Sequence, residues 1–172
     1  MLTPFPPLTL AFAACDKIGR MVKEFFQSSQ SVEWATPQDF FDHLDHVFDF
    51  QLDVCATREN RKCPRYFTKK QDGLEQSWHA YRRVWMNPPY GTSISKWMKK
   101  AYEESKKGCL VVALVPARVD TNWWKDWVSH KAHTEFIKGR LRFLPKGKSD
   151  YKHCAPFPSA LVFYGLLGDR YL

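Results

Sequence analysis

Residues 84–92 read "VWMNPPYGT", an apolar triplet that runs directly into asparagine, two prolines and a tyrosine. The triplet is typical of the end of a buried strand, and prolines cannot continue a sheet ladder because they donate no backbone N–H. A strand is therefore predicted to end at Asn87. The rigid turn after it should hold the Asn87 side chain, the Pro88 carbonyl and the Tyr90 ring at the carboxyl edge of a sheet, where open α/β sheets bind their ligands.

A helix and another strand are predicted upstream of this turn. The helix should begin at Pro37, with Thr36 as its N-cap and apolar side chains at helical spacing. Residues 48–54 alternate apolar and polar side chains, which is typical of a strand. Only about thirty residues separate the two strands, and one complete βαβ unit takes about 30 residues or more. The sheet should therefore be abbreviated on this side, with the basic segment 57–74 as a compact replacement.

Helices and strands continue to alternate downstream of the turn. A helix is predicted from Ile94 to Lys107, with Gly108 as its C-terminal stop, and "CLVVALVP" at 109–116 is the continuous apolar run of a buried parallel strand. A second helix, with Asp120 as its cap, carries three tryptophans, and "EFI" and "ALVFY" are two further strands. This alternation predicts an α/β layered sheet.

The chain has 172 residues, 44% of them hydrophobic, and a formal net charge of +8. That length fits one domain, expected over residues 31–172, with residues 1–30 as an N-terminal extension. The positive surplus favours a polyanionic partner, nucleic acid first and an acidic membrane surface second; a basic surface without such a role stays open. No segment approaches the roughly 18 consecutive apolar residues of a membrane span.

The five cysteines form no CxxC or CxxH pair. Their odd number and spacing predict neither a zinc site nor a disulfide framework. Reduced thiols in a cytoplasmic protein that binds no metal fit this pattern.

The residues of the turn suit one kind of ligand. A planar amino group on an aromatic ring needs acceptors for its N–H bonds and a flat face for stacking. Asn87 Oδ1 and the Pro88 carbonyl can supply the acceptors, and Tyr90 can supply the face. The alternative is a rigid turn without a ligand, with Tyr90 packed in the core beside Trp97.

The motif "NPPY" at 87–90 resembles the catalytic signature of amino-group methyltransferases that use S-adenosylmethionine. In order along the chain, "WATPQDFF", "FQLDVCA", "DGL", "NPPYG", "LVPARVDTNWW", "KGRLRF" and "APFPSALVFYG" are similar to the Dam-like family of phage and prophage DNA N6-adenine methyltransferases. The resemblance covers residues 33 to about 165. It implies an abbreviated Rossmann-like sheet with flanking helices, S-adenosylmethionine as cofactor and site-specific methylation of double-stranded DNA.

The resemblance also implies roles for the turn. Asn87 and the Pro88 backbone would hold the adenine N6 amino group and draw its lone pair out of conjugation, and Pro89 completes the motif. Tyr90 would stack on an adenine flipped out of the duplex. Methylation of a protein glutamine or an RNA base, which can use the same motif, remains an alternative. A non-catalytic DNA-binding module that kept the fold is another.

For the cofactor, the resemblance points to five positions, each with a structural alternative. Asp53 would attract the ammonium group of the methionine moiety, or else cap a helix or form a salt bridge. Asp72 would contact the adenine or ribose and Phe67 would cover the adenine ring, or both would serve only the loop. Thr36 and Pro37 would border the pocket, or Thr36 would only cap the helix. The glycine-rich loop of many methyltransferases is missing from "LDVCATREN", so the cofactor site must be built differently.

Two basic segments, 58–70 and 138–158, are each dense enough to neutralise several DNA phosphates. The second also contains aromatic residues that can wedge or stack, and a solvated charged loop is the alternative. No separate recognition domain fits within this length. The residues expected to contact DNA are Arg118, Lys138, Arg140, Arg142, Lys146, Lys148 and Lys152.

Overall fold

The computed structural model of the chain describes residues 36–141, 155 and 157–165, so the expected extension over residues 1–30 lies outside the described residues. Within these ranges, five strands form one mixed sheet in the order β1-β2-β3-β5-β4. β1, β2 and β3 are parallel, and β5 runs antiparallel to both of its neighbours. The expected α/β sheet is confirmed. Its strands are Leu52–Asp53 (β1), Arg83–Met86 (β2), Leu110–Pro116 (β3), His133–Phe136 (β4) and Ser159–Tyr164 (β5).

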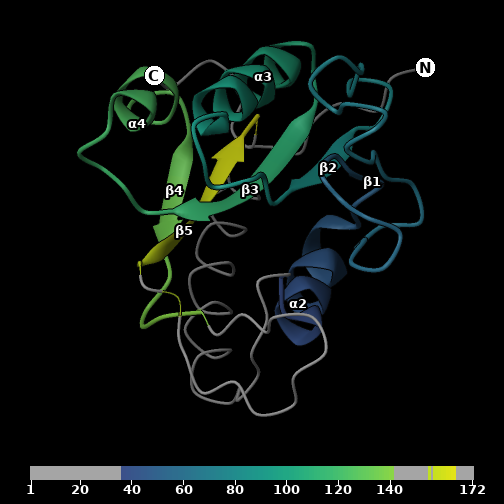
Figure 1. The fold of residues 1–172 in the computed structure, drawn as a ribbon, viewed down its shortest axis with the longest axis horizontal. Helices are drawn as coiled ribbons and strands as arrows, with labels where there is room; N and C mark the ends of the chain where they lie inside the picture. Colours follow the sequence, from purple (N-terminus) through teal and green to yellow (C-terminus); the bar gives the residue numbers. More distant parts are fainter. Residues whose placement is uncertain (1–35, 142–154, 156, 166–172) are drawn as a thin grey trace, which may run out of the picture.

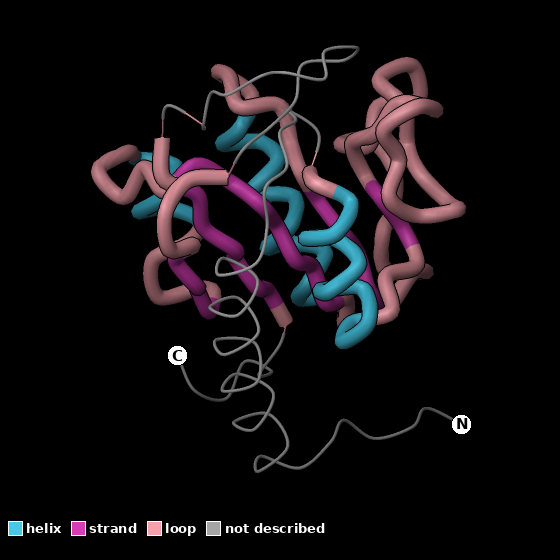
Figure 2. Tube along the Cα trace, turned by 90° about the horizontal axis from the view of Figure 1, so that it is seen from below, coloured by secondary structure: helices cyan, strands magenta, loops and turns pink. Residues whose placement is uncertain are grey.

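Helices cover both faces of the sheet (Figure 1). α2 (Gln38–Phe48) lies against one face, and α3 (Ile94–Lys106) and α4 (Asn122–Trp127) lie against the other. Figure 2 shows the molecule from the side of α2. The side chains of β2 alternate accordingly: Trp85 packs with the phenylalanines of α2, and its two neighbours belong to the core under α3. No helix among the described residues has the length and apolar character needed to cross a membrane.

The two helix caps expected from the sequence are wrong. Pro37 rather than Thr36 is the N-cap of α2, and no side-chain hydrogen bond caps that helix. α4 begins after Thr121. Asp120 lies one residue too early to cap it, inside a turn closed by the hydrogen bond from Thr121 N–H to the Arg118 carbonyl at 3.1 Å.

The strand expected over residues 48–54 is shorter than the alternating pattern. Phe48 is still part of α2, and Asp49 ends the helix in the left-handed conformation at φ 49°. The chain turns there, so Phe48 and Phe50 stack on each other with ring centres 5.5 Å apart instead of alternating along a strand. β1 therefore begins only at Leu52.

A compact segment, residues 54–82, fills the space where further βα units would stand (Figure 1). It adds one isolated bridge to the sheet, in which Tyr66 pairs in parallel with Asp53. A Cβ atom on Gly73 would lie 2.3 Å from the Val54 carbonyl oxygen, so the segment approaches the end of β1 as only glycine allows. The expectation of an abbreviated sheet is confirmed.

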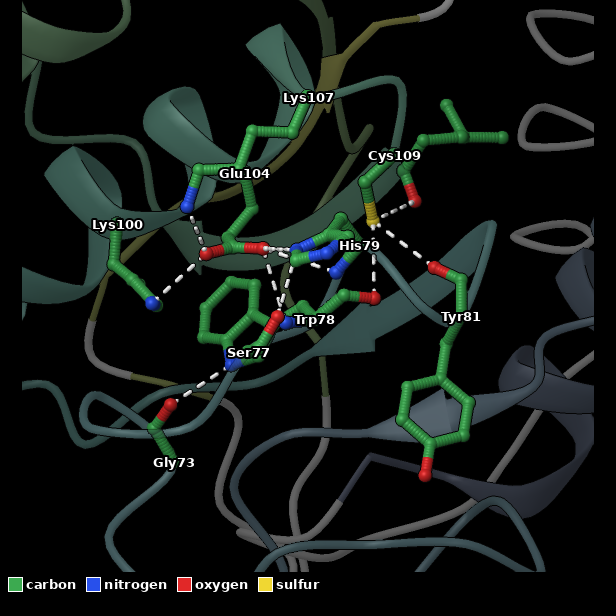
Figure 3. A network of polar contacts seen from close by, with 10 residues as sticks. Gly73, Ser77, Trp78, His79, Tyr81, Lys100, Glu104, Lys107 and Cys109 are labelled. Carbon is green, nitrogen blue, oxygen red and sulfur yellow. Dashed lines mark hydrogen bonds and ion pairs between the residues drawn. The ribbon is translucent and has the colours of Figure 1, made fainter.

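Glu104 on α3 holds the end of this segment (Figure 3). Its carboxylate is fully buried and accepts the backbone N–H groups of Trp78 and His79, each at 3.0 Å. It also pairs with the ammonium groups of Lys100 and Lys107, each at 2.9 Å. Burial acts to raise the pKa of Glu104, but the hydrogen bonds from the two lysines and from Trp78 outweigh it and lower the pKa to about 2. The ionised carboxylate therefore fastens the segment to α3.

Candidate active site

A pocket of about 300 Å³ lies at the carboxyl edge of β1 and β2. β1 and β2 run in parallel with Asp53 beside Trp85, so the residues that follow both strands meet at one edge. The expected catalytic turn thereby shares a pocket with two of the expected cofactor-binding residues, Thr36 and Asp53. The pocket is lined by Thr36, Asp53, Cys55, Asn60, Lys62, Trp85, Asn87, Pro88, Pro89 and Tyr90.

The Asn87 side chain is held at both ends of its amide. Nδ2 donates a hydrogen bond to Thr36 Oγ1 at 3.1 Å, and Oδ1 accepts one from the Tyr90 hydroxyl at 2.6 Å. Thr36 is 2% exposed and lines the pocket, and its hydroxyl makes no capping hydrogen bond to α2. An amide oxygen has two lone pairs, and Oδ1 therefore keeps one for another N–H donor.

Tyr90 contributes its hydroxyl to this arrangement as well as its ring. The hydroxyl oxygen also lies 3.2 Å from the Leu114 carbonyl oxygen, and the ring meets Phe157 edge-on at 5.5 Å and 84°. Burial raises the pKa of Tyr90 well above its usual range, so the hydroxyl remains a donor. The ring also packs against the core cluster that contains Trp97. Sequence reasoning considered only the face of the ring and missed the hydrogen bond to Asn87.

Asp53 is a buried carboxylate in the pocket wall, 3% exposed. It accepts the backbone N–H groups of Cys55 at 3.2 Å and Lys62 at 3.0 Å, so it shapes the loop after β1. Burial raises its pKa to about 6, although these two N–H donors and the positive charge of Lys62, which also lines the pocket, act to lower it. A cation in the pocket would stabilise the ionised form of this carboxylate, so Asp53 favours a cationic ligand group.

Cys55 lies in the same pocket but stays protonated at neutral pH. Burial, with the charge of Asp53, raises the pKa of the Cys55 thiol well above its usual range, although the Asn87 backbone N–H donates to it. A protonated thiol is a poor nucleophile. Within the described part of the chain, no three His, Cys, Asp or Glu side chains are grouped to hold a metal ion.

Three residues expected at the cofactor site do not line the pocket. Pro37 is the N-cap of α2. Phe67 is half-buried and extends the sheet through its backbone, donating to the Asp53 carbonyl at 2.9 Å. Asp72 is exposed at φ 49° and accepts the Leu74 N–H at 3.1 Å, which makes it part of a local turn.

Three of the basic residues expected to contact DNA are exposed at the same edge of the sheet. Arg118 follows β3, and Lys138 and Arg140 follow β4. The Arg118 guanidinium lies 6.0 Å from the ring centre of Phe157, the ring that also contacts Tyr90. The other four expected residues lie outside the described ranges: Arg142, Lys146, Lys148 and Lys152.

Sequence reasoning also missed Trp85 and Asn60 as pocket residues. The signal for Trp85 is its place in β2, where it faces the side opposite to its two neighbours. Asn60 Oδ1 accepts the Thr57 N–H at 2.6 Å and the Thr57 hydroxyl at 3.2 Å. These local bonds build the turn after β1 without glycine, and Asn and Thr at that spacing are a recognisable signal for it.

Residues 26–170 match the family model described as DNA N-6-adenine-methyltransferase (Dam). A protein named DNA N-6-adenine-methyltransferase from Haemophilus phage HP1 (strain HP1c1) is 28% identical over 161 residues, which cover 88% of this chain and 92% of the phage protein. A protein of the same name from Escherichia phage T1 is 28% identical over 109 residues and 63% of this chain, but the chain spans only 45% of that protein. The crystal structure of a Thermoplasma acidophilum protein covers 86% of this chain and 94% of its own, at 10% identity and a TM-score of 0.36.

Proposed function

Because this chain belongs to the DNA N-6-adenine-methyltransferase (Dam) family, we propose that it transfers a methyl group from S-adenosylmethionine to the N6 amino group of adenine at specific sites in double-stranded DNA. The observation that carries the proposal is the pocket shared by the Asn87 amide and the buried Asp53 carboxylate. Asn87 supplies an acceptor for an amino group, and Asp53 supplies a negative charge for a cationic cofactor.

The turn after β2 would hold the reacting amino group. The free lone pair of Asn87 Oδ1 and the carbonyl of Pro88 would accept the N6 protons, which draws the nitrogen lone pair away from the adenine ring and makes it more nucleophilic. The Asn87 amide is already held by Thr36 and Tyr90, so the acceptor needs little reorganisation when the base arrives. Positioning and electrostatics would therefore supply most of the catalysis.

The Asp53 carboxylate in the pocket wall suits the positive charges of S-adenosylmethionine. This cofactor carries an ammonium group and a sulfonium centre, and when bound it supplies an electrophilic methyl group. The pKa of Asp53 is about 6, so the carboxylate is mostly ionised at neutral pH and would pair with the ammonium group. Of the five cofactor positions expected from the sequence, we retain Asp53 as the one that would contact the cofactor. Thr36 also lines the pocket, but its hydroxyl accepts a hydrogen bond from the Asn87 amide.

Duplex DNA would approach the same edge of the sheet. Arg118, Lys138 and Arg140 are exposed there and can neutralise phosphates. An adenine inside the base stack cannot place its N6 in a pocket, so the target base must flip out of the duplex. Tyr90 and Phe157 would form the aromatic wall beside which it enters.

Transfer of labelled methyl from S-adenosylmethionine to unmethylated DNA tests the proposal, with nucleoside digestion and mass spectrometry to locate the label. We expect N6-methyladenine from the wild-type protein. Asn87→Ala should lower the rate about 100-fold or more, as for other lost transition-state hydrogen bonds, with an unchanged circular dichroism spectrum. Label in RNA or protein glutamine but not in DNA would show that DNA is not the substrate. Absence of cofactor binding would favour a non-catalytic DNA-binding module.

A further inference from the structure

The hydrogen bond from Asn87 to Thr36 joins residues 51 positions apart in the chain. Formation of α2 does not require it, because Pro37 is the N-cap and the Phe41 N–H reaches the Pro37 carbonyl at 3.0 Å. The Thr36 hydroxyl is buried and faces the amide of the residue that would hold the target amino group. Its contact therefore belongs to the pocket and not to the helix.

We propose that Thr36 is a positioning residue that fixes the plane of the Asn87 amide for the reaction. This inference rests on the proposed function. The last torsion of an asparagine side chain has a broad energy profile, so the side chain alone does not fix the plane of its amide. Thr36 holds the nitrogen end and Tyr90 holds the oxygen end, so the free lone pair of Oδ1 keeps one direction.

Loss of the Thr36 hydroxyl would release the nitrogen end of the amide. The amide could then turn about its Cβ–Cγ bond, with only the Tyr90 hydroxyl as a pivot at the oxygen end. Thr36 is 2% exposed, so solvent does not readily replace the missing hydroxyl. Misdirection of the acceptor would slow the methyl transfer step more than it weakens the binding of either substrate.

Thr36→Val removes the hydroxyl and keeps the size and branching of the side chain. We expect kcat for DNA methylation to fall about tenfold, as for loss of one neutral hydrogen bond. The Kd for S-adenosylmethionine and the KM for DNA should stay within about twofold of the wild type. Thr36→Ser restores the hydroxyl and should regain most of the lost kcat.

Ser159→Ala is the matched control for loss of a buried hydroxyl at this edge. Ser159 is buried at the start of β5, and its hydroxyl has no hydrogen-bond partner among the described residues, so kcat should not change. Wild-type kcat in Thr36→Val would overturn the proposal. So would a Thr36→Val protein that loses cofactor affinity at constant kcat, or a Thr36→Ser protein as slow as Thr36→Val.

A second measurement needs no turnover and separates this proposal from the proposed function. In 15N-labelled protein, the side-chain NH₂ signals of Asn87 are identified by their absence from Asn87→Ala. We expect their exchange with solvent to be faster in Thr36→Val than in the wild type and in Thr36→Ser. This result without any DNA methylation would overturn the proposed function and leave the contact in place. Equal exchange in all three proteins would overturn the positioning role itself.

Discussion

The charge of the Asp53 side chain in the pocket should change near pH 6 because its carboxyl group is buried. Its folded-state pKa of about 6 lies above the ordinary value of 3.8. As the pH rises from 3.8 to about 6, the unfolded chain therefore loses the Asp53 proton before the folded protein does, and the contribution of Asp53 to folded-state stability falls. The ionised form is the one that would pair with a cationic cofactor. Cofactor affinity should therefore rise over the same pH window in which this stability contribution falls.

We expect S-adenosylmethionine to bind most tightly above pH 6, with affinity falling by up to about tenfold per pH unit below it. Isothermal titration from about pH 5 to about pH 8 measures this profile. Asp53→Asn should bind weakly and lose the pH dependence. Asp72→Asn is the control, because Asp72 is exposed and outside the pocket, and it should keep the wild-type profile. A steep profile that persists in Asp53→Asn would remove Asp53 from the cofactor site.

Among the elements, the segment 54–82 depends on contacts at both of its ends. Near β1, Gly73 lets the backbone approach the Val54 carbonyl, which gives the glycine of "DGL" a steric reason. The Trp78 indole is fully buried and donates to the Gly73 carbonyl at 2.8 Å. At the other end, Glu104 binds the backbone of Trp78 and His79. The segment is thus held as one unit between β1 and α3.

We expect Glu104→Gln to lower the free energy of unfolding by about 2 kcal/mol, because the hydrogen bonds from Lys100 and Lys107 lose their charged acceptor. Urea unfolding at neutral pH measures the loss. The pKa of Glu104 is lowered in the folded state, so its contribution to stability is full above pH 4.5 and is lost as the pH falls toward 2. The variant should therefore lack this part of the acid sensitivity.

Glu103→Gln on the same helix is the control for Glu104. Glu103 pairs with Lys99 at 3.7 Å, and both side chains are about half exposed. An exposed pair of this kind contributes about 0.5 kcal/mol or less. Equal losses in the two variants would mean that the buried network does not hold the segment.

At the level of the whole molecule, the net charge of +8 favours a polyanionic partner, and exposed arginines stand at both edges of the sheet. Arg118 is exposed there, whereas Arg82 is exposed at the opposite edge, just before β2. We expect Arg118→Gln to weaken DNA binding and to reduce the slope of log affinity against log salt by about 1, because one phosphate contact is lost. Arg82→Gln should leave the slope unchanged. Fluorescence anisotropy over a salt series measures the affinity and the slope for each variant. Equal slopes for Arg118→Gln and the wild type would mean that DNA binds at a surface that does not include Arg118.

Much of this architecture follows from patterns that act over a few residues. The prolines after Asn87 end β2 because they cannot donate to a ladder, and Gly108 follows the end of α3 at φ 93°. The unbroken apolar run of β3 marks a strand buried on both faces. The short interval before β2 leaves no room for further βα units. Each of these features is local in the chain, so the sequence predicts it without knowledge of the partners.

The composition of the pocket depends instead on pairing between distant segments. The sequence of a threonine and a proline before an amphipathic helix is the same whether the threonine hydroxyl caps the helix or forms a hydrogen bond with Asn87. Packing of α2 against β2 places the Thr36 hydroxyl at Asn87. Asp53 and Asp72 are both candidate cofactor carboxylates in the sequence, and the path of the segment 54–82 leaves the first buried and the second exposed. Burial and long-range hydrogen bonds arise only when the sheet assembles, so local sequence patterns do not predict them.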